Sequence, residues 1–250
     1  MELKGILAFV IVIGSALLII ILSFRRLQQK LPFDLRPFPA LKRLQRAIGL
    51  AVEDGKRQHL ALGSSSMLEP TSASALVGLS ALDCVTQLSI ASDRPPVATS
   101  GDGTLSILSQ DTMRAAYLKG NAVEQNPFYN GRLVGINPSS YIAGTLPVVY
   151  DEYVSTHLLI GSFGPEIALV SDAADRQNAF VMASSDSLPA QSVLFAAAQE
   201  PLIGEELFAV PAYLKANPAH RASLHTQDIL RWILIIALVI GSFLKLAGVI

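Results

Sequence analysis

Charged residues and cysteines are both scarce in this sequence. Only 16% of the 250 residues are charged, and a single cysteine, Cys84, excludes an intrachain disulfide and any multi-cysteine metal site. The net charge of −1 gives no overall basic field, so nucleic acid is not an expected partner. With 51% hydrophobic residues and a mean hydropathy of +0.44, the chain is too apolar for an ordinary soluble domain. We therefore expect part of it to lie in a lipid bilayer.

Catalytic signatures are missing as well. No turn carries the lysine of a P-loop, residues 101–103 lack the third glycine of a dinucleotide fingerprint, and there is no G-x-S-x-G nucleophile elbow. A catalytic base is not expected either, because His59 and His157 fall at the beginnings of apolar runs, while His220 and His225 lie beside a membrane segment. The sequence therefore gives no support for an enzyme, and we expect neither a cofactor nor a metal ion.

Two long apolar segments lie at the ends of the chain. Residues 5–24 are twenty uncharged residues, which at about 1.5 Å per residue match a hydrocarbon core of ~30 Å. Two arginines follow this segment where a signal peptide would carry its cleavage site, so we expect it to remain as an anchor. Residues 229–250 form a second candidate span, with one cation near each end and Trp232 at its boundary.

Basic residues gather after the first apolar segment and not before it. Only Lys4 precedes residues 5–24, whereas several cations lie in the connector that follows. Because positive charge marks the cytoplasmic side, we expect two spans that place residues 25–228 in the cytoplasm and both termini outside. Anionic lipid is the expected contact of the first three cations, which are Arg25, Arg26 and Lys30.

The composition divides the chain into five parts. They are a transmembrane helix (1–24), a basic connector with a helix (25–55), an α/β domain (56–200), an apolar extension with a linker (201–228) and a second transmembrane helix (229–250). The helix of the connector is expected over residues 41–53, with Lys42, Arg43 and Arg46 between its apolar positions. Two interpretations of these cations stay open: a solvated face beside anionic headgroups, or specific recognition of a lipid or polyanion.

The central domain repeats one pattern five times: a short apolar run, a turn of small residues and a helical segment. The runs are residues 59–63, 96–99, 132–136, 157–161 and 179–183. Their starts are 37, 36, 25 and 22 residues apart, which leaves room each time for a crossover helix. The pattern predicts an α/β fold with a Rossmann-like parallel sheet of about five strands, helices on both faces, and a transmembrane helix at each end.

The turns after these runs are where a ligand is expected, because ligands bind beyond the carboxyl ends of parallel strands. One hypothesis is a cradle of backbone amides and serine hydroxyls for a small anion or nucleotide. The alternative is that glycines, N-cap serines and first-turn carboxylates serve the turns alone. If a ligand binds, the residues expected to line its site are Ser64, Ser65, Asp102, Gly161, Ser162, Gly164 and Glu166.

An apolar stretch, residues 201–214, follows the last repeat and does not fit its pattern. Two interpretations stay open: a lid that packs on the domain's own sheet, or a contact patch for another subunit. The candidate interface residues are Leu207, Phe208, Val210 and Tyr213.

The order of four segments resembles an uncharacterised family of bacterial two-span membrane proteins, known only as a domain of unknown function. The segments are Gly63-Ser-Ser-Ser66, Gly161-Ser-Phe-Gly-Pro-Glu166, Glu200-Pro-Leu-Ile-Gly-Glu-Glu-Leu-Phe208 and the stretch from Ala219-His to Leu230-Arg-Trp232. The resemblance implies a two-pass protein of a bacterial inner membrane and brings no activity with it. Three features of the sequence lead us to expect a non-enzymatic protein that self-associates into a homo-oligomeric scaffold: the missing catalytic residues, the apolar stretch outside the repeat, and a membrane segment at each end of the domain. The alternative is a sensor of a small anion or nucleotide.

Overall fold

The structure is a computed structural model that describes residues 3–24, 37–67, 71–122, 129–214 and 218–246. The chain forms two compact units. One consists of Met1–Arg36 with Asn217–Ile250, and the other of Pro37–Ala216. Arg25, Arg26 and Lys30, the expected lipid contacts, lie outside the described residues.

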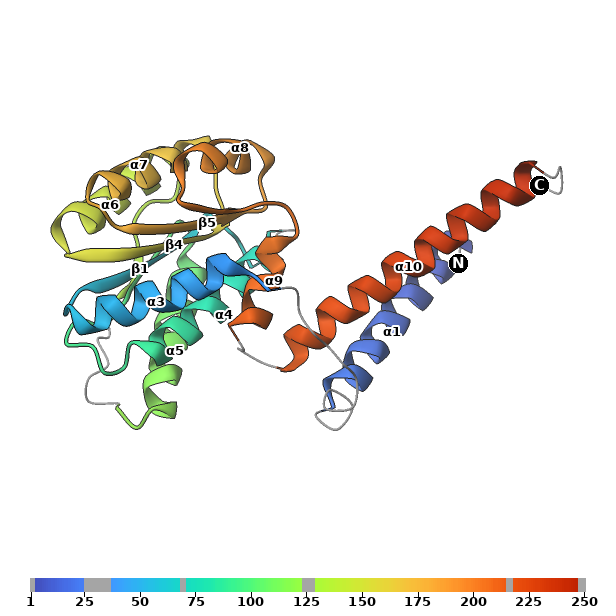
Figure 1. Cartoon of the computed structure of the whole chain (residues 1–250), viewed down its shortest axis with the longest axis horizontal. Helices are drawn as coiled ribbons and strands as arrows, with labels where there is room; N and C mark the ends of the chain where they lie inside the picture. Colours follow the sequence, from blue (N-terminus) through green and yellow to red (C-terminus); the bar gives the residue numbers. More distant parts are fainter. Residues whose placement is uncertain (1–2, 25–36, 68–70, 123–128, 215–217, 247–250) are drawn as a thin grey trace. The chain divides into compact units, whose positions relative to one another are not determined.

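A six-stranded, all-parallel sheet forms the centre of the second unit (Figure 1). Its strands are β1 (Arg57–Gly63), β2 (Val97–Ser100), β3 (Gly131–Leu133), β4 (Val154–Ser162), β5 (Phe180–Ser185) and β6 (Glu200–Leu202). The spatial order is β3-β2-β1-β4-β5-β6, the order of doubly wound nucleotide-binding folds. The predictions of an α/β fold and a parallel sheet are therefore confirmed.

The sixth strand is a correction to the predicted count of about five. β6 lies at the start of the stretch that did not fit the repeat, and its Glu200, Pro201 and Leu202 pair with β5. Pro201 has no backbone N–H to donate, which restricts it to an edge strand or a bulge. β6 is an edge strand, so the proline that argued against a strand in the sequence is tolerated there.

Helices cover both faces of the sheet, as predicted (Figure 1). One layer consists of α3 (Pro39–Glu53), α4 (Ser72–Leu88), α5 (Gly103–Lys119) and α9 (Glu206–Tyr213). The other consists of α6 (Pro138–Asp151), the short η2 (Pro165–Ile167), α7 (Ala168–Arg176) and α8 (Leu188–Ala197). Successive side chains of a strand point to opposite faces, so Leu158 packs in the first core and Leu159 in the second.

The extension after β6 packs on its own domain. Leu207 and Val210 of α9 are fully buried in the core shared with α3 and α4. Phe208 and Tyr213 are partly buried against the same core, and the Tyr213 ring lies 5.4 Å from the ring of Phe38. This packing favours the lid over the intersubunit contact, because at least two of the four candidate interface side chains are already covered.

The first unit contains two helices, α1 (Leu3–Ser23) near the N-terminus and α10 (Pro218–Leu246) near the C-terminus. The two helices pack against each other (Figure 1). Among the described residues, one helix, α10, is long and apolar enough to cross a membrane by its length and composition. None of the most apolar segment of this helix is buried inside the protein. The described apolar part of α1, Ala8–Ser23, is shorter. One candidate span is thus found, and the N-terminal span stays a prediction.

Candidate functional site

The carboxyl ends of β1 and β4 meet where the strand order reverses, which is the usual ligand position in such sheets. The backbones approach very closely there. A Cβ at Gly161 would lie 2.1 Å from the carbonyl oxygen of Leu62, and a Cβ at Gly63 would lie 2.2 Å from that of Ser162. Gly63 also has φ +69°, a conformation that favours glycine. Close strand packing therefore explains these glycines without a ligand.

Four of the seven predicted ligand residues come together at this edge. Ser64, Ser162, Gly164 and Glu166 line a hollow, together with the buried Tyr141 of α6. The hollow has a volume of about 10 Å³. That volume is near the minimum for one water molecule, so it does not admit a phosphate group.

The other predicted residues have structural partners. Ser65 is fully buried, and its hydroxyl accepts a hydrogen bond from the Ser162 backbone N–H at 2.8 Å. Asp102 is the N-cap of α5, where its carboxylate accepts from the Leu105 N–H at 2.9 Å. These contacts match the interpretation in which the serines and carboxylates serve the turns.

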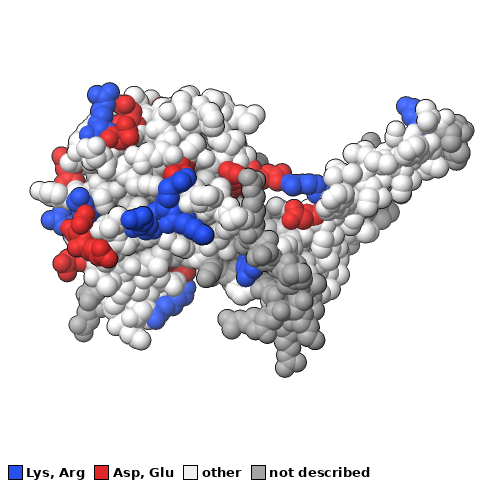
Figure 2. All heavy atoms as spheres, viewed as in Figure 1, with Lys and Arg blue, Asp and Glu red and all other residues white. Residues whose placement is uncertain are grey.

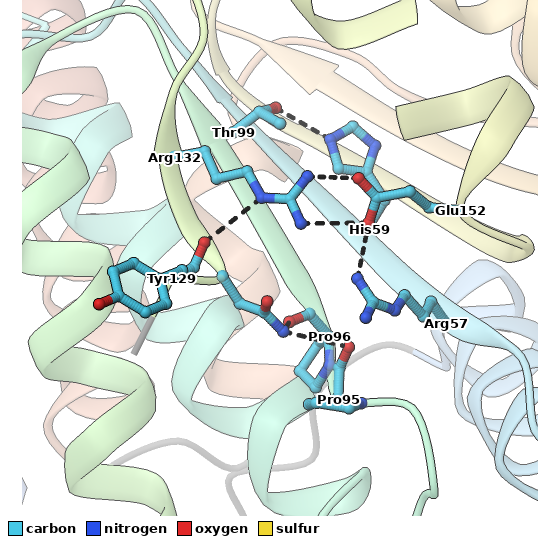
Figure 3. Close-up of polar contacts among 9 residues, drawn as sticks. Arg57, His59, Pro95, Pro96, Thr99, Tyr129, Arg132 and Glu152 are labelled. Carbon is cyan, nitrogen blue, oxygen red and sulfur yellow. Dashed lines mark hydrogen bonds and ion pairs between the residues drawn. The ribbon is translucent and has the colours of Figure 1, made fainter. Parts of the chain in front are cut away.

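A buried chain of polar side chains runs behind the hollow, on the sheet face covered by α6. His59 and His157 are fully buried with their Nδ1 atoms 3.0 Å apart, and His59 Nε2 lies 2.9 Å from the Thr99 hydroxyl (Figure 3 shows His59 and Thr99). The Thr99 hydroxyl lies 3.1 Å from the Tyr141 hydroxyl, which accepts from the Gly63 N–H at 3.3 Å. These polar contacts thus connect His157 of β4 to Tyr141, whose side chain lines the hollow.

The sequence did not predict this row of buried polar side chains, because the contact between its two histidines depends on the order of the strands. His59 and His157 are register partners only because β1 and β4 are neighbours, although β2, β3 and, among the described residues, three α-helices separate them in sequence. The available signal was that both histidines occupy the same place in their apolar runs. That signal identifies neighbours only when the order of the strands is known.

Burial keeps both imidazoles neutral. Desolvation lowers the pKa of His157 to about 3. Desolvation, and then electrostatic repulsion from His157 and Arg132, lower the pKa of His59 well below its usual value. Burial also raises the pKa of Tyr141 to about 12. A general acid or base works best with a pKa near the working pH, so these groups are suited to structure and not to proton transfer at neutral pH.

A charged cluster lies at the opposite, amino-terminal edge of the sheet. Glu152, just after α6, binds both Arg57 and Arg132, and the Arg57 Nη1 to Glu152 Oε2 distance is 2.6 Å (Figure 3). Arg132 Nε also donates to the Tyr129 carbonyl at 3.3 Å. One carboxylate between two guanidinium groups leaves a net positive charge, which helps to keep His59 unprotonated.

A larger hollow, about 510 Å³, lies next to the start of β2 and away from every predicted ligand residue. Its size is in the range of small-molecule sites. Its lining is Ile90, Ala91, Ser92, Asp93, Pro95, Tyr117 and Ala122. Ser92, Asp93 and Tyr117 contribute polar side chains to this lining, and only Asp93 is charged.

Comparison with known proteins gives a family and no activity. The described residues contain no group of three or more His, Cys, Asp or Glu that could hold a metal ion. No curated protein and no solved structure matches the chain. A family described as a domain of unknown function, DUF6754, matches residues 1–250. The chain therefore belongs to the DUF6754 family over its whole length.

Proposed function

We propose that this protein is a membrane-anchored, non-enzymatic scaffold whose α/β domain self-associates through helix α8. The main observation in support is that α8, a helix at the surface, contains no charged residue. Its sequence is LPAQSVLFAA. Leu188 is 77% exposed and Phe195 is 69% exposed. They are seven residues apart and therefore on the same side of the helix. An exposed apolar face of this kind supports an interaction site in this proposal.

The buried side of α8 is fixed by contacts with the rest of the domain. Ala190 and Leu194 are fully buried in the core. Gln191 donates to the Ser185 carbonyl at 2.9 Å and accepts from the Gly204 N–H at 3.0 Å. Since the inner side of the helix is fixed by these contacts, Leu188 and Phe195 are presented on a rigid element. Binding through such a surface loses little conformational entropy.

Membrane anchoring supports assembly. The apolar surface of α10 suits a bilayer. In this proposal α1, which contacts α10, is the second span of a two-pass protein. In this proposal the domain lies on the cytoplasmic side of a bacterial inner membrane and both termini lie outside, following the distribution of basic residues. Confinement to a membrane raises the effective concentration of the domain, so a modest α8 contact is sufficient for assembly.

The test uses the full chain in mild detergent and chemical cross-linking over a range of concentrations. We expect cross-linked dimers or larger species for the wild type, and their loss in Leu188→Glu/Phe195→Glu, because a buried contact would then hold unpaired charges. Ile107→Glu is the matched control, since Ile107 is 67% exposed on α5, in the other helix layer. Equal cross-linking of the two variants would contradict the α8 contact, and a monomeric wild type at all concentrations would contradict self-association.

The turns after the strands do not support the alternative function, a sensor of a small ligand. A sensor needs space for its ligand, and the hollow lined by Ser64, Ser162 and Glu166 has a volume of only about 10 Å³, near the minimum for one water molecule. The ligand hypothesis therefore has no observation in its favour beyond the chemistry of the turns.

A further inference from the structure

Helix α3 has a basic outer face. Its inner side carries the buried Leu44 and Ile48, and its exposed side carries Lys42, Arg43 and Arg46. Positions 42, 43 and 46 are neighbours on one side of a helix. Figure 2 shows a group of basic side chains over the α3 region of the domain. The three cations therefore form one patch, which we call the α3 basic face.

The charge of this face is incompletely neutralised. Arg43 forms an ion pair with Glu200 of β6, with Arg43 Nη2 at 2.7 Å from Glu200 Oε2. Lys42 and Arg46 form no ion pair within the described part of the chain. Their positive charge is thus available to an external anion.

We infer that the α3 basic face docks on anionic lipid headgroups. The inference rests on the membrane anchoring of the proposed function and not on self-association. Its first support is charge: residues 25–46 contain seven basic residues (25, 26, 30, 36, 42, 43 and 46) and one acidic residue (34). Basic clusters of this size next to a membrane span on the cytoplasmic side bind anionic lipid.

The second support is the length of the connection. α1 ends at Ser23 and α3 begins at Pro39. At about 3.5 Å per residue, these sixteen steps allow a separation of at most ~55 Å. The connection is therefore short enough to keep the start of α3 within ~55 Å of the end of α1, and contact between α3 and a membrane that holds α1 is compatible with this limit. In physiological salt, the electrostatic attraction between the α3 basic face and lipid headgroups acts only within about 10 Å. Docking therefore requires the α3 basic face to lie against the headgroups, and it weakens as salt is added.

The test measures how close α3 comes to the lipid. The full chain carries Cys84→Ala, which removes the single cysteine, and Gly49→Cys, which places a fluorophore beside the basic face. A Cβ at Gly49 meets no atom within 4 Å, so the label disturbs no packing. One protein copy per nanodisc is used, and quenching by headgroup-labelled lipid is compared between phosphatidylcholine alone and a mixture with phosphatidylglycerol. Gln177→Cys, exposed after α7 in the other helix layer, is the control label.

We expect at least threefold more quenching at position 49 with phosphatidylglycerol than without it, and its loss in 0.5 M salt. Lys42→Glu/Arg46→Glu removes the difference, whereas Arg46→Lys keeps it because the charge is retained. Both positions are exposed, so the variants fold, which circular dichroism checks. Quenching that is independent of lipid charge, or equal at positions 49 and 177, would overturn the inference and leave self-association untouched. A chain that does not enter nanodiscs would overturn the anchor and the inference together.

Discussion

The buried histidine pair makes the folded domain sensitive to mild acid. In the unfolded chain a histidine has a pKa of about 6.5. In the folded domain burial lowers the pKa of His157 to about 3 and that of His59 well below its usual value. Below pH 6.5 the unfolded state therefore binds protons that the folded state rejects. The free energy of unfolding falls as the pH decreases from about 6.5 towards the folded pKa values.

The size of the effect follows from the proton balance. Between pH 7 and pH 5 a buried histidine with a folded pKa of about 3, such as His157, loses about 2 kcal/mol of stabilisation relative to the unfolded chain, and His59 adds a loss of the same sign. Domains are typically stable by 5–15 kcal/mol, so the loss is a large part of the total. At pH 5 the domain should therefore unfold at a clearly lower urea concentration than at pH 7.

The assay is urea unfolding of the full chain in detergent, followed by circular dichroism at pH 7, 6 and 5. His157→Gln removes one of the two titrating groups, so we expect a clearly smaller pH dependence whatever the variant's stability at pH 7. Tyr141→Phe is the control: it removes a hydrogen-bonding hydroxyl, which costs about 1 kcal/mol, but it does not change the pH dependence. Equal stability at pH 7 and pH 5, or an unchanged slope in His157→Gln, would refute the reasoning.

Four further predictions concern single residues. Gly161→Ala should lower the free energy of unfolding by more than about 2 kcal/mol, because its Cβ would meet the Leu62 carbonyl at 2.1 Å. Gly49→Ala, in open space on α3, should instead raise it by up to ~1 kcal/mol in the same urea titration. Asp102→Ala should cost about 1 kcal/mol through loss of the α5 cap, and Asp102→Asn should restore most of it. Burial raises the pKa of the Cys84 thiol to about 11, so its alkylation at pH 8 should be slow in the folded chain and fast in urea.

Much of the fold could be predicted because its parts have local signatures. The five apolar runs correspond to β1 to β5, and the helix expected over residues 41–53 corresponds to α3. β6 was missed because it is three residues long and contains Pro201, so its identity depends on pairing with β5. Local pattern alone could not identify a strand that is defined by its neighbour.

The candidate site was only partly predictable for the same reason. The turns after β1 and β4 were expected to meet, and four of the seven residues line one hollow. The size of that hollow depends on packing by Tyr141 and on backbone contacts at Gly63 and Gly161, which no local pattern contains. The contact between His59 and His157 depends on strand order. The exposure of Leu188 and Phe195 likewise required the three-dimensional arrangement of α8.

The central claim is that this membrane-anchored domain functions as an assembly of identical chains. Native mass spectrometry of the full chain, released from its own membrane in nanodiscs, tests it most directly. We expect a protein mass of two or more times 26.7 kDa, reduced to the mass of one chain in Leu188→Glu/Phe195→Glu. A wild-type protein that is released only as single chains of 26.7 kDa would contradict it.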